Sequence, residues 1–294
     1  MSSLAQPTMR CNCRRALCMV LSLIVALFSI CLSPSAAKPG LSWYCTRAKD
    51  HIQPRADQAL SFVESCGGRY IDHRHTDPNA VEKIAYLTFD VGYENGQVAR
   101  VLDTLKAENV EGAFFILGHV VEACPDLVRR MADEGHLVCN HTFTHKNLVG
   151  SPPEALAEEL GRLEKACLEQ TGVTVAPYFR PPEGRFDRAM LETASKLGYT
   201  TVFWSFAYAD WDNQNQPDPA AAQKKIMENI HNGAVLLLHP TSQTNATILG
   251  NVIRDMKAQG YRFGHLDELR GAIDTESRDA CASACIDSVG REGE

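Results

Sequence analysis

The chain has 294 residues, 45% of them hydrophobic and 22% charged, which is enough apolar material for one large domain or two small ones. This balance excludes disorder over most of the length. The formal net charge of −7 at pH 7 disfavours nucleic acid as a partner, because chains that bind polyanions carry an excess of basic residues.

The N-terminal residues carry a targeting pattern. Arg14 and Arg15 precede an apolar run over residues 16–32, and small residues ending at Ala37 offer a cleavage site. We interpret residues 1–37 as an export signal. The run of about 17 residues lies at the lower limit for a membrane span, so an uncleaved anchor through residues 16–32 is the alternative. Both readings predict that the rest of the chain is extracytoplasmic, secreted or anchored at the cell envelope.

An odd number of cysteines follows this leader, and export allows some of them to form disulfides. Spacing alone does not define the pairing. Cys139 lies in the apolar stretch Leu137-Val138-Cys139, which predicts a buried free thiol. The candidates for pairing, all in the terminal segments, are Cys45, Cys66, Cys281 and Cys285.

A regular alternation of β and helical patterns begins after an N-terminal extension, residues 38–82, in which a helix is expected around 56–65. Seven β/α units in succession predict a parallel sheet, either open or closed into a barrel. A polar tail, residues 274–294, follows the last unit. The apolar β runs are 84–89, 113–117, 136–140, 178–180, 201–208, 234–239 and 261–265, and the helical patterns are 95–108, 125–134, 153–170, 187–197, 219–231, 247–259 and 266–273.

The first of these β runs ends at a carboxylate. The stretch YLTFDVGYENG, residues 86–96, places Asp90 after a buried strand and before a turn at Gly92. In α/β proteins the carboxyl ends of the strands are where active sites are built. We therefore predict that Asp90 is a catalytic base, and the alternative is a turn or helix-capping residue.

The third and fourth β runs also end in residues that carry chemistry. His141 and His145 are four apart, a spacing that puts both rings on one side of a helical turn, as a metal pair requires. Arg180 precedes two prolines that hold the backbone extended, and its guanidinium can clamp a carboxylate. A pair with Asp90 would keep that carboxylate ionised. A surface arginine before a rigid turn is the simpler alternative.

The fifth and sixth β runs complete the pattern. The aromatic stretch 202–208 leads to Asp210 and Trp211, and the apolar run 233–238 ends at His239. A histidine after such a run is sometimes only a hydrogen-bonded core residue. However, five of the first six strands each end in an acid, an arginine or a histidine, which indicates one functional edge of the sheet, because chance would scatter such residues.

The set TFDVGY, HTFTH, RPPEG, DW and LLLHP resembles the five motifs of the polysaccharide deacetylase family, the NodB-homology hydrolases, over residues 84–270. The stretches YLTFDxGYENG, TVFWS…DW and LLLH…S…NA further resemble the delta-lactam-biosynthetic peptidoglycan de-N-acetylase subgroup. The resemblance implies a distorted (β/α)7 barrel over residues 83–273. It also implies removal of the acetyl group from N-acetylmuramic acid of peptidoglycan, which leads to muramic delta-lactam in the spore cortex during sporulation.

Two alternatives are a deacetylase of N-acetylglucosamine in peptidoglycan or chitin, and a non-catalytic glycan-binding protein. The partners implied are peptidoglycan glycan strands, and the chain is expected to be a monomer. The resemblance implies that Asp90 is the general base and His239 the general acid, with Arg180 and Asp210 as their orienting partners. It implies that His141 and His145 are ligands of a divalent metal such as zinc. The substrate contacts that it implies are Tyr93, Glu183 and Trp211.

One position departs from the family pattern. The usual TFDD places a second aspartate, a metal ligand, where this chain has Val91. Valine cannot bind a metal, so the two imidazoles should hold it more weakly than the three-ligand sites common for zinc. Metal identity and metal dependence therefore stay open. If the site is otherwise intact, Val91→Asp is expected to supply a third ligand.

Overall fold

The computed structural model describes residues 40–270 as one folded unit, with residues 1–39 and 271–294 outside the described part. Its main sheet is parallel, with β5 (Lys83–Val91) between β11 (Ala234–Leu238) and β6 (Ala113–Ile116). The order continues from β6 through β7 (Leu137–Asn140), β8 (Ala176–Phe179) and β10 (Thr200–Val202) to β4 (Gly68–Arg69), while β12 (Tyr261–Phe263) pairs with the start of β5.

The sheet curls until its two ends meet. Ile71, just after β4, bridges Ala234 of β11, and Phe206, beyond β10, bridges Leu236. The predicted strand 201–208 is therefore interrupted. Its first part pairs with β8 and β4, and Ser205 and Phe206 then turn onto β11 through hydrogen bonds to the backbone of Val235. The predicted distorted (β/α)7 barrel is confirmed. The distortion lies at the barrel seam, the place where Ile71, Ser205 and Phe206 meet β11.

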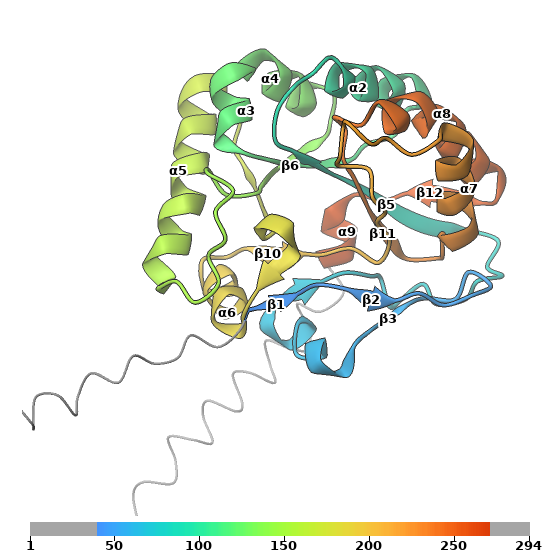
Figure 1. Cartoon of the computed structure of the whole chain (residues 1–294), viewed down its shortest axis with the longest axis horizontal. Helices are drawn as coiled ribbons and strands as arrows, with labels where there is room; N and C mark the ends of the chain where they lie inside the picture. Colours follow the sequence, from blue (N-terminus) through green and yellow to red (C-terminus); the bar gives the residue numbers. More distant parts are fainter. Residues whose placement is uncertain (1–39, 271–294) are drawn as a thin grey trace, which may run out of the picture. The chain divides into compact units, whose positions relative to one another are not determined.

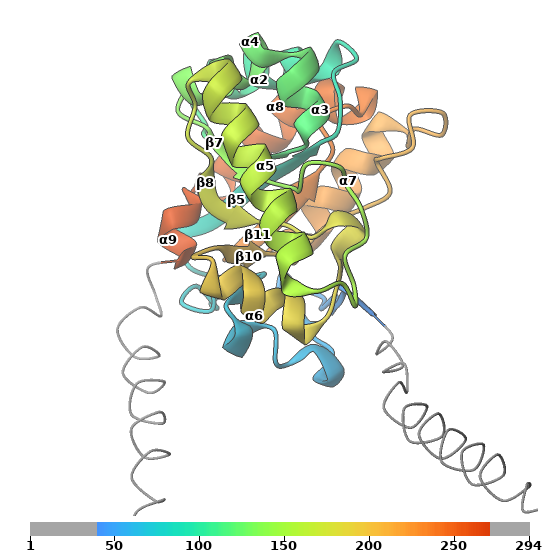
Figure 2. The ribbon, with the colours of Figure 1, turned by 90° about the vertical axis from the view of Figure 1, so that its left-hand side faces the viewer.

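Helices cover the outside of the curved sheet (Figure 1), and neighbouring helices pack along its length in the order α7, α8, α2 and then α4, α3, α5 and α6. Figure 2 shows α5 crossing in front of the strands. The helices are α2 (Gln97–Glu108), α3 (Gly118–Ala123), α4 (Pro125–Asp133), α5 (Pro153–Thr171), α6 (Arg188–Lys196), α7 (Pro219–Asn229), α8 (Gln243–Ala258) and α9 (Leu266–Arg270). Only the short α3 was not expected from the sequence.

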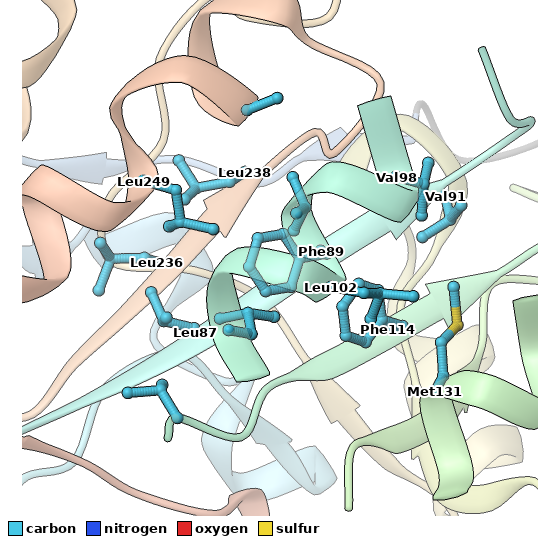
Figure 3. Packing of buried hydrophobic residues seen from close by; sticks show 14 of the residues in the cluster. Leu87, Phe89, Val91, Val98, Leu102, Phe114, Met131, Leu236, Leu238 and Leu249 are labelled. Atoms are coloured by element: carbon cyan, nitrogen blue, oxygen red, sulfur yellow. The ribbon is translucent and has the colours of Figure 1, made fainter. Parts of the chain in front are cut away.

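Alternation along β5 divides the core into two layers. Side chains at odd positions, such as Leu87 and Phe89, pack against the helices (Figure 3), while Ile84 and Tyr86 belong to the cluster inside the barrel. Leu266 of α9 packs into this inner cluster and covers the amino-terminal ends of the strands. Asp90 also faces inward but lies near the carboxyl end of β5, outside this cluster, where it can take part in a functional site.

The N-terminal extension forms short elements beside the barrel. The expected helix over 56–65 is wrong. Two 3₁₀ helices, η1 (Gln58–Leu60) and η2 (Glu64–Cys66), occur instead, because the buried residues Leu60, Val63 and Cys66 are spaced by three, the period of a 3₁₀ helix. The two-residue strands outside the main sheet are β1 (Leu41–Ser42), β2 (Cys45–Thr46), β3 (Arg55–Ala56) and β9 (Arg185–Phe186), and η3 (Pro182–Gly184) precedes β9.

The cysteines within residues 40–270 are all free thiols, so Cys45 and Cys66 do not pair with each other, and Cys139 is fully buried as predicted. Cys281 and Cys285 lie outside the described residues. The apolar run 16–32 lies outside them too. Among residues 40–270, no helix is long and apolar enough to cross a membrane.

Candidate active site

The carboxyl ends of neighbouring strands bring together the chemistry-bearing residues. Asp90 is the penultimate residue of β5, His141 directly follows β7, and Arg180 directly follows β8. Asp210 lies in the loop after the barrel seam, and His239 directly follows β11. Because β5 lies next to β11, the two parts of the site meet along one edge of the sheet.

Asp90 and Arg180 form a buried ion pair. Arg180 Nη1 donates to Asp90 Oδ1 over 2.7 Å, and the arginine side chain is fully buried. Its Nη2 donates to the hydroxyl of Thr88 over 2.8 Å, and its Nε donates to the carbonyl of Val202. The guanidinium also stacks over the ring of Phe115. The guanidinium of Arg180 therefore links β5 and β10, and it holds one oxygen of the Asp90 carboxylate.

The charge balance keeps Asp90 ionised. Burial alone would raise the pKa of Asp90, but the charge of Arg180, the neighbouring His141 and His239 and the hydrogen bond from Arg180 together outweigh burial, so the pKa lies below its ordinary value. Asp90 Oδ2 does not take part in the arginine contact and lies 3.5 Å from Nε2 of His141. One oxygen is thus held by the cation while the other faces the site.

His141 has a defined tautomer. Its Nδ1 lies 2.8 Å from the carbonyl oxygen of Arg180, which can only accept, so Nδ1 carries the proton and Nε2 has a free lone pair. Burial lowers the pKa of His141 to about 4, so the ring is neutral near pH 7. A neutral imidazole held by a second hydrogen bond is the form that binds metal ions.

His145 reaches His141 by a different path from the one expected. The predicted helical turn is wrong, because residues 141–145 form a loop in which Thr142 and His145 have φ values of 70° and 59°. This irregular backbone still brings the two ring centroids to 5.0 Å, with His145 exposed and His141 buried. The donor set fits a divalent ion bound by two imidazoles.

Val91 does not face this pair. Its side chain is fully buried in the apolar layer between β5 and the helices, beside Val98 of α2 (Figure 3). Alternation explains the direction, since Asp90 faces inward and the next residue must face outward. Within the described part of the chain, no group of three His, Cys, Asp or Glu side chains could hold a metal. The position that is usually acidic is therefore occupied by a core residue.

Asp210 and His239 form the second pair. Asp210 Oδ1 lies 2.7 Å from Nδ1 of His239, and Oδ2 accepts from the backbone N–H of His239 over 2.8 Å. Burial by itself would lower the pKa of His239, but the hydrogen bond and the charge of Asp210 have the opposite effect. Because this opposing effect is larger, the pKa lies above the ordinary value of 6.5. The imidazolium form is thus more stable than in an unperturbed histidine, and in that form Nε2–H is the remaining donor.

The predicted substrate contacts lie on exposed positions near these pairs. Trp211 is 62% exposed, and its ring stands edge-on to the ring of His239 at a centroid distance of 6.3 Å. Tyr93 is 43% exposed, and its hydroxyl contacts the amide of Asn213. Glu183 is exposed with φ 57°, a strained conformation of a kind that often occurs at functional sites.

Three residues around the pairs had no role assigned from the sequence, although Thr88 is part of the stretch TFDVGY and Asn245 is part of LLLH…S…NA. Thr88 supports Arg180 from the inner face of β5, and its inward position two residues before Asp90 is a signal that could have identified it. Tyr208 and Asn245 extend the hydrogen-bond network behind Asp210, and Asn245 comes from the first turn of α8. No local sequence pattern connects Asn245 with Asp210, because the two are 35 residues apart.

Residues 77–202 match the family model for polysaccharide deacetylase. The chain is 40% identical over 230 residues to the peptidoglycan-N-acetylmuramic acid deacetylase PdaA of Bacillus subtilis, an alignment that covers 78% of this chain and 85% of that protein. The chain belongs to the polysaccharide deacetylase family. The structure of Bacillus subtilis PdaA, described as a family 4 carbohydrate esterase, matches this deacetylase fold with a TM-score of 0.73 and 39% identity over 79% of this chain and 97% of that one.

A further relative is named for a different amino sugar. The peptidoglycan-N-acetylglucosamine deacetylase PgdA of Listeria monocytogenes is 34% identical over 189 residues, which cover 63% of this chain and 38% of that protein. The family thus includes relatives named for each of the two amino sugars of peptidoglycan.

Proposed function

We propose that this chain hydrolyses the N-acetyl group of N-acetylmuramic acid in peptidoglycan. The observation that carries the proposal is the presence of two oriented ion pairs, Asp90–Arg180 and His239–Asp210, at the ends of the adjacent strands β5 and β11. An amide is a poor electrophile whose cleavage needs both a base and an acid. The substrate follows from the 40% identity to the N-acetylmuramic acid deacetylase PdaA.

Asp90 acts as the general base. Arg180 holds Oδ1 and keeps the carboxylate ionised, so Oδ2 takes a proton from water while the water oxygen attacks the acetyl carbonyl carbon. His239 acts as the general acid. Its Nδ1–H is bonded to Asp210, so Nε2 gives its proton to the amide nitrogen as the carbon–nitrogen bond breaks. The products are acetate and the free amine of the sugar.

His141 and His145 are the proposed ligands of a divalent metal, with zinc as one candidate. When bound, such an ion polarises the acetyl carbonyl and stabilises its developing negative charge. The chain contributes a neutral Nε2 on His141, fixed by the hydrogen bond from Nδ1 to the Arg180 carbonyl. Since Val91 faces the core, we propose that two protein ligands hold the ion, more weakly than three would.

Tyr93, Glu183 and Trp211 are the proposed substrate contacts. The exposed ring of Trp211 beside His239 offers an apolar face to a sugar ring, and Tyr93 offers a second aromatic face. Glu183 can accept hydrogen bonds from sugar hydroxyls at the edge of the site. These groups would position the acetamide between the acid and the base.

We further propose that the enzyme acts outside the cytoplasm as a monomer on glycan strands. Residues 1–37 would direct export, residues 16–32 would serve as the anchor if cleavage does not occur, and residues 83–273 would form the catalytic domain between the extension 38–82 and the tail 274–294. The muramic amine released by this reaction could condense with the neighbouring lactyl carboxyl to form the delta-lactam of the spore cortex. Mature protein found in the cytoplasm with Met1 intact would contradict the export proposal.

A deacetylase of N-acetylglucosamine is the second candidate. The proposed acid and base contact only the acetamide, which both sugars share, and PgdA is named for this substrate. The test is to incubate the purified enzyme with defined muropeptides, with and without stem peptides and divalent ions, and to locate the lost acetyl group by mass spectrometry. Loss from N-acetylmuramic acid supports the proposal, whereas loss only from N-acetylglucosamine favours the second candidate. Asp90→Asn is the inactive control.

A further inference from the structure

A buried polar network continues behind the pair of Asp210 and His239. Nδ2 of Asn245 donates to Asp210 Oδ2 over 2.6 Å and to the backbone carbonyl of His239 over 3.0 Å. On the other side of the amide, Oδ1 of Asn245 contacts the hydroxyl of Tyr208. Asn245 is 2% exposed and Tyr208 is 7% exposed, so neither exchanges these bonds readily for water.

The chemistry of these groups fixes the direction of every hydrogen bond. The carboxylate of Asp210 and the carbonyl of His239 can only accept, so the Asn245 side chain must turn its NH₂ group toward both of them. Its oxygen then faces Tyr208, whose hydroxyl must donate. The arrangement therefore has one satisfied orientation, and a flipped amide would leave two buried acceptors facing an oxygen.

We propose that Asn245 and Tyr208 are positioning residues for His239, the proposed general acid. Tyr208 donates to the oxygen of the Asn245 amide and so stabilises the orientation that Asp210 and His239 require. Asn245 then holds the Asp210 carboxylate and the His239 backbone together, so the imidazole keeps one orientation while Nε2 gives up its proton. This role rests on the proposed function, since it assigns the network to the acid of that reaction.

The network should also affect the charge balance at His239. Asp210 and Asp90 favour the imidazolium, while Arg180 opposes it. The NH₂ group of Asn245 shares the negative charge of Asp210, so its removal should leave more of that charge acting on His239. The pKa of His239 should then rise, and the basic limb of the pH–rate profile should move to higher pH.

Two variants test the network, each with a matched control at the opposite end of the barrel. Tyr208→Phe removes one buried hydroxyl, and Tyr178→Phe removes another, which contacts Asp267. Asn245→Leu removes the amide, and Asn232→Leu removes an equally buried amide that bonds the backbone of Ile84. The readouts are kcat and KM for acetate release, the pH–rate profile, and a nitrogen NMR titration of His239 in the substrate-free protein.

We expect Tyr208→Phe to lower kcat about 3- to 10-fold and Asn245→Leu about 10- to 100-fold, both with little change in KM. Asn245→Leu should also raise the pKa of His239 in the titration, while both controls leave kcat and that pKa unchanged. A titration curve for Asn245→Leu that stays in place or moves to lower pH would overturn the proposal. So would a loss of activity that only follows the loss of folded protein.

The NMR titration separates this proposal from the proposed function. If the wild-type enzyme released no acetate from any muropeptide, the proposed function would fail, and the titration would still decide whether Asn245 controls His239.

Discussion

The Asp210→Asn substitution tests the proposed general acid most directly, because it changes one atom of a buried side chain. Asp210 Oδ1 accepts from Nδ1 of His239, and Oδ2 accepts from the His239 backbone and from Asn245. An asparagine has only one acceptor oxygen. It must turn that oxygen toward the two fixed donors, which leaves its NH₂ group facing Nδ1 of His239. Nδ1 then accepts, and the single proton of a neutral imidazole moves to Nε2.

A neutral imidazole is a poor acid, since giving up its last proton would leave an imidazolate. We therefore expect a loss of about 10²- to 10⁴-fold in kcat/KM, the usual contribution of general acid catalysis, or about 2.7–5.4 kcal/mol of transition-state stabilisation. The pH dependence should change as well. Asp210 raises the pKa of His239, so its removal lowers that pKa, and the protonated acid is lost at a lower pH than in the wild type.

The assay is acetate release from a defined muropeptide over a range of pH, combined with thermal unfolding. Asp72→Asn is the matched control, because Asp72 is a buried carboxylate near the amino-terminal ends of the strands that accepts from Arg74 and Tyr86. The control should lose stability and keep the wild-type pH profile. A basic limb that does not move in folded Asp210→Asn would refute the assignment of His239 as the acid.

Three other substitutions test the remaining assignments. Asp90→Asn should leave the fold intact and reduce turnover by about two to four orders of magnitude, whereas Asp72→Asn should not; near-normal acetate release from folded Asp90→Asn would refute the base. Val91→Asp should lower the free energy of unfolding by about 3–5 kcal/mol in denaturant titrations, because it buries an unpaired charge in the apolar layer, and Val98→Asp should cost as much. A milder loss for Val91→Asp together with tighter metal binding would mean that the strand end turns the new carboxylate toward the imidazoles. His145→Ala should weaken divalent ion binding in calorimetry without lowering the melting temperature, since the side chain is exposed, and unchanged affinity would contradict the metal assignment.

The sequence alone determined the positions at which the site is built. The apolar runs predict the strands, and the end of each strand predicts where its polar residue appears, so the sequence places Asp90, Arg180 and His239 at the strand ends where the structure has them. Such patterns are short-range: burial and the two-residue period of a strand are recorded in consecutive residues. The same period could have shown that Val91 faces away from Asp90, and the family motif alone did not reveal it.

Only the tertiary structure decided which distant groups complete these residues. The loop from His141 to His145 has a backbone that no periodic pattern predicts, and the barrel seam near Phe206 depends on where β11 lies. Asn245 reaches Asp210 from a helix that begins 33 residues later in the chain. The physical reason is that a buried polar group must find a partner, but the partner can come from any segment that packs against it, and that choice is made by the fold as a whole.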